Sequence, residues 1–156
     1  MLQKNFGGSY DCSLTSITAL GLFKNNYNQN ADDIYSKVEK IAKKYFYSAE
    51  KFGTIPIFIK NIINNAFNVN SKSKYIKGVG FNWELIKKNI DNKNPMILSI
   101  SNDGRNYYTN HSVTIVGYRE YSPTNAKILV IYDNWSNVRS CIDYNKLSCI
   151  SSINYF

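Results

Sequence analysis

The period of the hydrophobic pattern changes near Pro95, and this change restricts the fold more than any other feature of the chain. Before Pro95, apolar residues recur at the spacing of helices. After Pro95, β-rich segments follow one another with turn residues between them. Helices first and strands later favour an α+β fold, in which N-terminal helices pack against a C-terminal antiparallel sheet.

Four helices are predicted in the N-terminal part. Asp11 or Ser13 is available to cap the first, which is expected to be amphipathic, and Asn82 to cap the last. Thr54 can cap the third, and Pro56 suits its first turn because no needed hydrogen bond is lost there. The predicted helices cover residues 12–23, 32–46, 54–67 and 83–90.

Six strands are predicted, most of them in the C-terminal part. A polar loop over 68–77 is expected to lead to a short strand at about 75–79. The later strands are expected at 96–101, 111–121, 127–132, 138–143 and 148–155. The chain has no visible repeat or linker, and 156 residues can bury a substantial core. A single domain over residues 1–156 is therefore expected.

The composition excludes two classes of protein. A hydrophobic fraction of 44% and an aromatic fraction of 15% exclude a disordered chain. The longest apolar runs, such as Met96-Ile97-Leu98, are far too short to cross a bilayer, so no membrane span is expected. No charged-then-apolar signal segment precedes Gln3. The location stays open between a secreted or cell-surface protein and a domain of a larger bacterial protein, and the oligomeric state is not indicated.

The net charge of +8 lies in one region. Between Lys37 and Lys93, twelve lysines stand against four acidic residues, while the rest of the chain is balanced. Such a region could attract nucleic acid, an anionic cell-wall polymer or an acidic peptide. A solvated helical face explains the lysines equally well. No recognised nucleic-acid-binding module accompanies them, so no nucleic-acid partner is expected.

The three cysteines are Cys12, Cys141 and Cys149, and their odd number leaves at least one thiol free. Cys141 and Cys149 could pair in an oxidising compartment, which the sequence does not decide. Three dispersed cysteines and a single histidine lack the paired short spacings of zinc ligands. No metal site and no cofactor are therefore expected.

Cys12 stands where the first predicted helix begins. The N-terminus of a helix carries a partial positive charge and unpaired N–H groups, which favour a neighbouring sulfur as the nucleophilic thiolate. A lone cysteine in a helix is also commonly a small buried residue without chemistry. The choice between these readings depends on residues far along the chain.

His111 and Asp133 are the candidate base and the candidate orienting acid for a catalytic Cys12. His111, the only histidine, begins a predicted strand after a polar loop, and Asp133 ends the next strand. Each also has a non-catalytic interpretation: His111 could be a surface residue or a buried, hydrogen-bonded one, and Asp133 could simply belong to a turn. If the two strands are adjacent, His111 and Asp133 lie close together. A thiol on a helix, facing a base and an orienting acid on a sheet, is what cysteine-nucleophile catalysis needs.

Several short motifs resemble the papain-like cysteine peptidases, and the nearest branch is the one that includes the double-glycine leader peptidases of bacteriocin export. The resemblance covers most of the chain and implies a papain-like cysteine peptidase fold. The motifs are Asp11-Cys12, Gly53-Thr54, Asn94-Pro95-Met96-Ile97, Asn110-His111-Ser112-Val113, Gly117-Tyr118 and Asp133-Asn134-Trp135.

The resemblance also implies roles for individual residues. Cys12 would be the nucleophile, and His111 the general base that later protonates the leaving amine. Asp133 would hold the orientation of the imidazole, and Trp135 would shield that pair from water. The implied substrate is a peptide or a protein.

Two positions depart from the pattern of the family. The glutamine that helps to bind the oxyanion normally precedes the cysteine by about six residues, where this chain has Phe6. Gln3, reached across a flexible glycine pair, or Asn5 could replace it. Ser13 stands where leader peptidases usually have glycine. Both departures bear on activity more than on fold.

The sequence therefore predicts a thiol hydrolase that cleaves a peptide or amide bond through an acyl-enzyme on Cys12. Transfer to another amine is equally open, because the same intermediate serves both reactions. The alternative is a catalytically inactive papain-like domain that binds peptide or cell-wall material. A third class, a basic nucleic-acid-binding protein, would be retained on DNA in a strongly salt-dependent way.

Overall fold

The computed structural model describes residues 10–76, 82–101, 108, 110–136 and 138–156. Within these residues the helices are α1 (Cys12–Lys24), α2 (Ala31–Ala42), α3 (Ile59–Phe67) and α4 (Trp83–Asp91). The strands are β1 (Lys72–Tyr75), β2 (Met96–Ile100), β3 (His111–Tyr121), β4 (Ala126–Tyr132), β5 (Ser140–Asp143) and β6 (Ser152–Tyr155). Short 3₁₀ helices cover Lys43–Tyr45, Pro56–Phe58 and Tyr144–Lys146.

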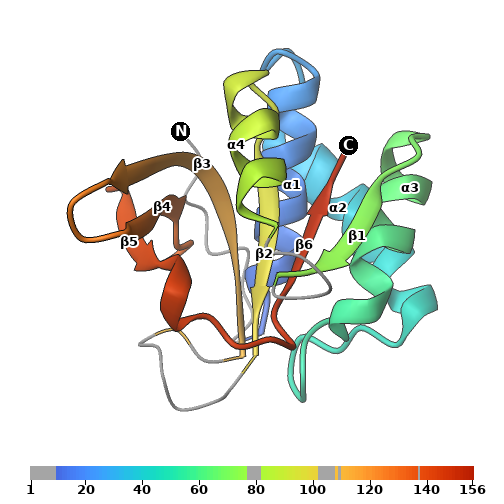
Figure 1. Cartoon of the computed structure of the whole chain (residues 1–156). Helices are drawn as coiled ribbons and strands as arrows, with labels where there is room; N and C mark the ends of the chain where they lie inside the picture. The colour runs from blue at the N-terminus through green and yellow to red at the C-terminus, as the bar shows by residue number, and fades with distance from the viewer. Residues whose placement is uncertain (1–9, 77–81, 102–107, 109, 137) are drawn as a thin grey trace.

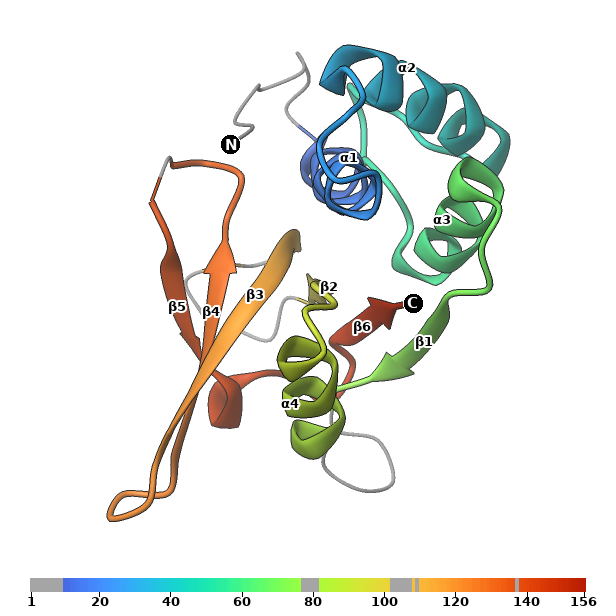
Figure 2. The same cartoon turned by 90° about the horizontal axis from the view of Figure 1, so that it is seen from above.

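The strands form one antiparallel sheet in the order β1-β6-β2-β3-β4-β5. Helices α1, α2 and α3 lie on one face of the sheet and α4 lies on the other (Figures 1 and 2). Each face has its own core, because successive residues of a strand point to opposite sides. Ile97 of β2 packs with α1–α3, whereas its neighbours Met96 and Leu98 pack with α4. The predicted α+β class is confirmed.

Helix α1 is the central helix of its layer. It contacts α2 and α3 on one side and β2 and β3 on the other (Figure 2). Its polar residues Ser13, Thr15, Ser16 and Thr18 are therefore as buried as its apolar ones. The expectation of an amphipathic first helix was wrong, because the sheet covers the polar residues of α1.

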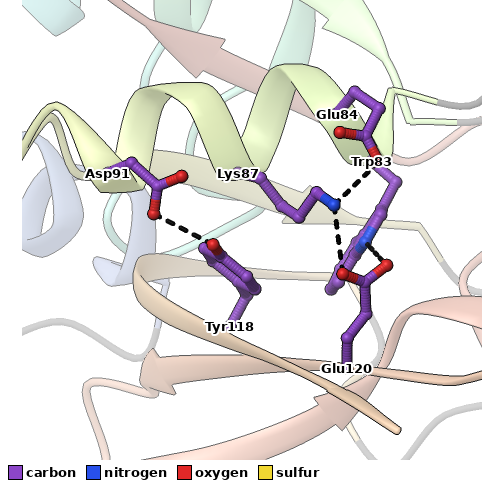
Figure 3. Close-up of polar contacts among 6 residues, drawn as sticks. All are labelled: Trp83, Glu84, Lys87, Asp91, Tyr118 and Glu120. Carbon is purple, nitrogen blue, oxygen red and sulfur yellow. Dashed lines mark hydrogen bonds and ion pairs between the residues drawn. The ribbon is translucent and has the colours of Figure 1, made fainter. Parts of the chain in front are cut away.

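Helix α4 is held to the far end of β3 by exposed charges and one buried ring. The Trp83 indole N–H donates to Glu120 at 2.7 Å, and Lys87 lies 3.0 Å from the same carboxylate (Figure 3). Lys87 also pairs with Glu84 on its own helix, at 2.9 Å. One further bond joins the Tyr118 hydroxyl to Asp91. These bonds fasten the helix across the end of the strand.

Three helix caps differ from the expectation. The third helix begins with a 3₁₀ turn after Ile55, and the buried Thr54 hydroxyl caps nothing. Asp11 and Asn82 occupy the N-cap positions of α1 and α4, but neither side chain makes a capping bond. The Asp11 carboxylate accepts a hydrogen bond from Tyr47, and the Asn82 amide donates to main-chain carbonyls at the end of β1. Tertiary partners outcompete the local cap in both.

The shortest strands are the ones that the sequence places least well. Strand β1 lies inside the expected loop, and most of the strand predicted at 75–79 falls outside the described residues. All four β1 residues are exposed, so no apolar pattern marks the strand, which forms by pairing with β6. The predicted strand at 148–155 is shortened to β6.

Three expectations from the sequence concern a membrane span, a metal site and a disulfide, and each can be compared with the described residues. In that part of the chain, no helix combines the length and the apolar character needed to cross a membrane. No cluster of three or more histidine, cysteine or acidic side chains is placed there to hold a metal ion. All three cysteines are free thiols, so Cys141 and Cys149 do not pair, and both are exposed.

Candidate active site

The predicted nucleophile and base open onto the same cleft. Cys12 is the first residue of α1, His111 is the first residue of β3, and both line a cavity of about 830 Å³. The loop of residues 51–56 and Trp135 line the same cavity. Cys12 is half-buried and is a free thiol.

His111 is buried beneath two aromatic rings. Its own exposure is 5%, while Trp135, which stacks on the imidazole at 4.2 Å between centroids, is 56% exposed. Tyr108 stacks on the imidazole as well, at 5.8 Å. The exposed indole therefore lies over the buried imidazole, and its shielding role stays a prediction.

The protonation of His111 follows from its burial and from one hydrogen bond. Burial lowers its pKa, although the bond to the Asp133 carbonyl and the nearby Asp133 charge act in the opposite direction. The imidazole is thus neutral at neutral pH. Its Nε2 lies 2.6 Å from that carbonyl oxygen, which only accepts, so Nε2 carries the proton and Nδ1 is the basic nitrogen.

The Asp133 carboxylate organises the loop after β4. Oδ1 accepts hydrogen bonds from the main-chain N–H groups of Trp135 and Ser136, each at 3.0 Å. Oδ2 accepts from the hydroxyls of Tyr108 at 2.9 Å and Ser140 at 3.1 Å. Burial raises the pKa of Asp133, but these bonds outweigh it and leave the pKa below the usual value. The structure brings Asp133 to His111 through its main-chain carbonyl, while the carboxylate holds the loop.

A row of buried hydroxyls joins α1 to the sheet beside the cleft. Ser112 Oγ lies 2.8 Å from Ser13 Oγ and 3.4 Å from Ser99 Oγ, and Ser16 Oγ donates to the Ser112 carbonyl at 3.3 Å. Ser13, which departs from the glycine of leader peptidases, thus has a partner next to His111. Sequence reasoning missed this row, although serines three residues apart in an apolar helix are a signal for one.

Asn134 was also missed as a site residue. Its side-chain nitrogen lies 3.1 Å from the Cys12 carbonyl oxygen, 2.9 Å from the Ser112 carbonyl oxygen and 2.9 Å from Ser16 Oγ. Its φ of 65° lies in the left-handed region, which asparagine tolerates better than most residues. A single amide therefore touches both elements that carry the predicted catalytic pair.

The main chain before Cys12 lies close to Gly53 in the loop of residues 51–56. Gly53 has a φ of +68°, and a Cβ at this position would lie 2.6 Å from the Tyr10 carbonyl oxygen. The Asp11 carboxylate is buried against the Tyr47 hydroxyl, and burial raises the pKa of Tyr47, which stays a neutral donor. The two residues that precede α1 thus have close neighbours: Tyr10 lies against Gly53, and Asp11 accepts from Tyr47.

The expected oxyanion donors cannot be placed, because Gln3 and Asn5 both lie outside the described residues. Cys12, His111, Trp135 and the main chain of Asp133 are brought together at one end of the sheet. This arrangement offers a thiol and a neutral base with a fixed tautomer on one cleft of about 830 Å³.

Comparison with known proteins agrees with this geometry. The sequence profile of the Peptidase_C39-like family matches residues 1–150. A solved structure from Bacillus anthracis, described as a C39-like peptidase, matches with a TM-score of 0.62 over 98% of this chain and 92% of that chain. At 12% identity this likeness shows the fold alone. No curated protein matches the sequence. Because the profile spans almost the whole sequence, the chain belongs to the Peptidase_C39-like family, a branch of the papain-like cysteine peptidases.

Proposed function

We propose that the protein is a cysteine peptidase that cleaves a peptide or amide bond through an acyl-enzyme on Cys12. The observation that carries the proposal is the shared cleft, in which Cys12 begins a helix and His111 presents a neutral imidazole. A helix N-terminus favours the thiolate, and a buried neutral imidazole is the base that a thiol requires. The substrate is a peptide or a protein.

The proposed reaction uses His111 twice. Nδ1 takes the thiol proton, and the thiolate attacks the substrate carbonyl carbon, so that a C–S bond forms. The leaving amine then receives the proton from the imidazolium as the C–N bond breaks. Water, or another amine, then attacks the thioester carbon as Nδ1 takes its proton, so that a C–O or C–N bond forms and the C–S bond breaks, and the proton passes to the Cys12 sulfur. Nε2 keeps its bond to the Asp133 carbonyl throughout, and the Asp133 charge stabilises the imidazolium.

Gln3 or Asn5 is the expected donor to the oxyanion. Replacement of the true donor by alanine should lower the turnover rate by about a hundredfold or more and leave substrate binding nearly unchanged. Measurement of both alanine variants on one peptide substrate therefore identifies the donor. Equal rates for both variants and the parent would show that neither side chain serves.

One observation favours a second candidate function. Phe6 occupies the usual position of the oxyanion glutamine, which suits a papain-like domain that binds peptide or cell-wall material without cleaving it. The two functions differ in the reactivity of Cys12. A domain that only binds has no need for a thiol that reacts faster than an ordinary one.

The experiment measures alkylation of Cys12 by iodoacetamide between pH 5 and pH 9. Cys141 and Cys149 are exposed thiols, so both are first replaced by serine. We expect Cys12 to react at pH 6 at least tenfold faster than glutathione, and His111→Ala to abolish that advantage. Cys12→Ala should abolish cleavage of a peptide library monitored by mass spectrometry. Ordinary reactivity together with no cleavage would leave the binding function.

A further inference from the structure

We propose that Asn134 is a positioning residue, whose side-chain amide fixes Cys12 relative to His111 by holding α1 against β3. This inference rests on the proposed function and adds a residue to its site. Its starting point is that the amide reaches two residues 100 positions apart in the sequence, the nucleophile itself and the neighbour of the base.

The orientation of the amide follows from its partners. The carbonyl oxygens of Cys12 and Ser112 can only accept hydrogen bonds, so the atom between them is the side-chain nitrogen. Its two hydrogens serve these two acceptors, and Ser16 Oγ lies within reach of the same group at 2.9 Å. If this amide were flipped by 180°, its oxygen would face two carbonyl oxygens, and none of the three could donate a hydrogen bond.

One of the two carbonyls belongs to the nucleophile, and the other belongs to the residue next to the base. One is the main chain of Cys12, so the bond holds the nucleophile directly. The other is the main chain of Ser112, which follows His111 on β3. A short side chain with two rotatable bonds therefore links the main chain of Cys12 to the main chain beside His111, and Asn134 itself lines the cleft.

The neighbours of Asn134 hold it in place and act on the same imidazole. The Asp133 carbonyl accepts from His111, and the Trp135 ring covers the imidazole. The Asp133 carboxylate binds the main-chain N–H groups of Trp135 and Ser136, which fixes the loop around Asn134. Three consecutive residues thus orient the base, position the nucleophile and exclude water.

The amide is not needed to keep α1 in the fold. Leu14, Ile17 and Leu20 of α1 are fully buried and anchor the helix in the core between the layers. Removal of the amide should therefore leave the helix in place but allow its first turn to shift against β3. A displacement of about 1 Å between reacting groups can cost on the order of a hundredfold in rate.

The test compares Asn134→Gly and Asn134→Asp with Glu120→Gln at the far end of β3, all in the Cys141→Ser/Cys149→Ser background. Glycine accepts the positive φ without the amide, and aspartate keeps the shape but cannot donate. The readouts are the pH profile of Cys12 alkylation and the urea midpoint of unfolding. Both Asn134 variants should lose at least tenfold in alkylation rate at pH 6 and shift the profile towards that of glutathione. Glu120→Gln should keep the parent profile.

The outcomes separate this inference from the proposed function. If His111→Ala leaves the alkylation profile unchanged, Cys12 is not coupled to His111, and both proposals fall. If His111→Ala abolishes the fast reaction and the folded Asn134 variants retain it, only the positioning role is overturned. Loss of the folded state in both Asn134 variants would also overturn it, because the amide would then be a requirement of the fold.

Discussion

Strand β3 is joined to a helix at each end, and the two joints are built from opposite kinds of interaction. At its start, the buried hydroxyls of Ser13 and Ser112 and the half-buried amide of Asn134 hold α1. At its far end, the exposed ion pair of Lys87 and Glu120 helps to hold α4 (Figure 3). Only the first joint lies beside the cleft.

The difference has energetic consequences. A buried hydrogen-bonding group that loses its partner costs its full desolvation free energy, so the row at the start of β3 tolerates few arrangements. Exposed ion pairs contribute little and are screened by salt, so the far end tolerates many. A joint of buried neutral groups therefore suits the end of β3 at which Cys12 and His111 must keep a fixed relative position. Such a joint adds no charge beside the thiol and the imidazole.

The largest effect on stability is expected at the far end, from a ring rather than from a charge. Trp83 is 1% exposed and packs on Tyr144 at 5.0 Å and on Tyr118 at 5.8 Å. Trp83→Ala should lower the free energy of unfolding in urea by about 3–5 kcal/mol, because the lost ring leaves a cavity. The alkylation profile of Cys12 should not change. A changed profile would show that the two ends of β3 are coupled.

Gly53→Ala is the next largest change, and it tests the end with the cleft. The positive φ is strained for alanine, and its Cβ would meet the Tyr10 carbonyl at 2.6 Å, so stability should fall by about 1–3 kcal/mol. Because Tyr10 lies two residues before Cys12, the alkylation rate should fall as well. Gly117→Ala on β3 is the matched control, since its Cβ meets only the Val130 side chain, at 3.2 Å. If Gly53→Ala and Gly117→Ala changed the alkylation rate equally, the contact between Gly53 and Tyr10 would not be what positions Cys12.

The buried row should show coupling between its members. Ser112→Ala leaves the hydroxyls of Ser13 and Ser99 short of a partner, which should cost about 1–2 kcal/mol of unfolding free energy. The Ser13→Ala/Ser112→Ala double variant should cost less than the sum of the two single variants. A double-mutant cycle in urea measures this difference. Strict additivity would mean that the two hydroxyls do not stabilise each other.

The fold was easier to predict from the sequence than the joints were. The change of period near Pro95 is local, so it predicted helices followed by strands, and residue type with spacing singled out Cys12 and His111 as candidates. The role of Asn134 depends on partners 22 and 122 residues away, which no local pattern encodes. The polar residues of α1 were misread for the same reason, because the strands that pack on them, β2 and β3, begin 72 residues or more after the helix ends.

Acid should destabilise the two ends in different pH ranges. Burial lowers the pKa of His111, so the unfolded chain binds a proton that the folded protein resists. Stability should therefore fall as the pH drops through the usual histidine value of about 6.5 towards the lower folded value. His111→Gln should remove this slope between pH 7 and pH 5, measured by urea unfolding at each pH. An unchanged slope would assign the loss to other groups.

The far end should respond at lower pH and more weakly. The hydrogen bond from Lys87 lowers the pKa of Glu120, with help from the Trp83 indole, so Glu120 stabilises the protein above its usual pKa and loses this effect as the pH falls through the lower folded value. Glu120→Gln should remove a small acid-dependent loss of stability that begins below about pH 4.5. High salt should weaken the same contribution in the parent, because the pair is exposed, and should leave the His111 slope nearly unaltered. If salt altered both slopes equally, the contrast between a buried neutral joint and an exposed charged one would be wrong.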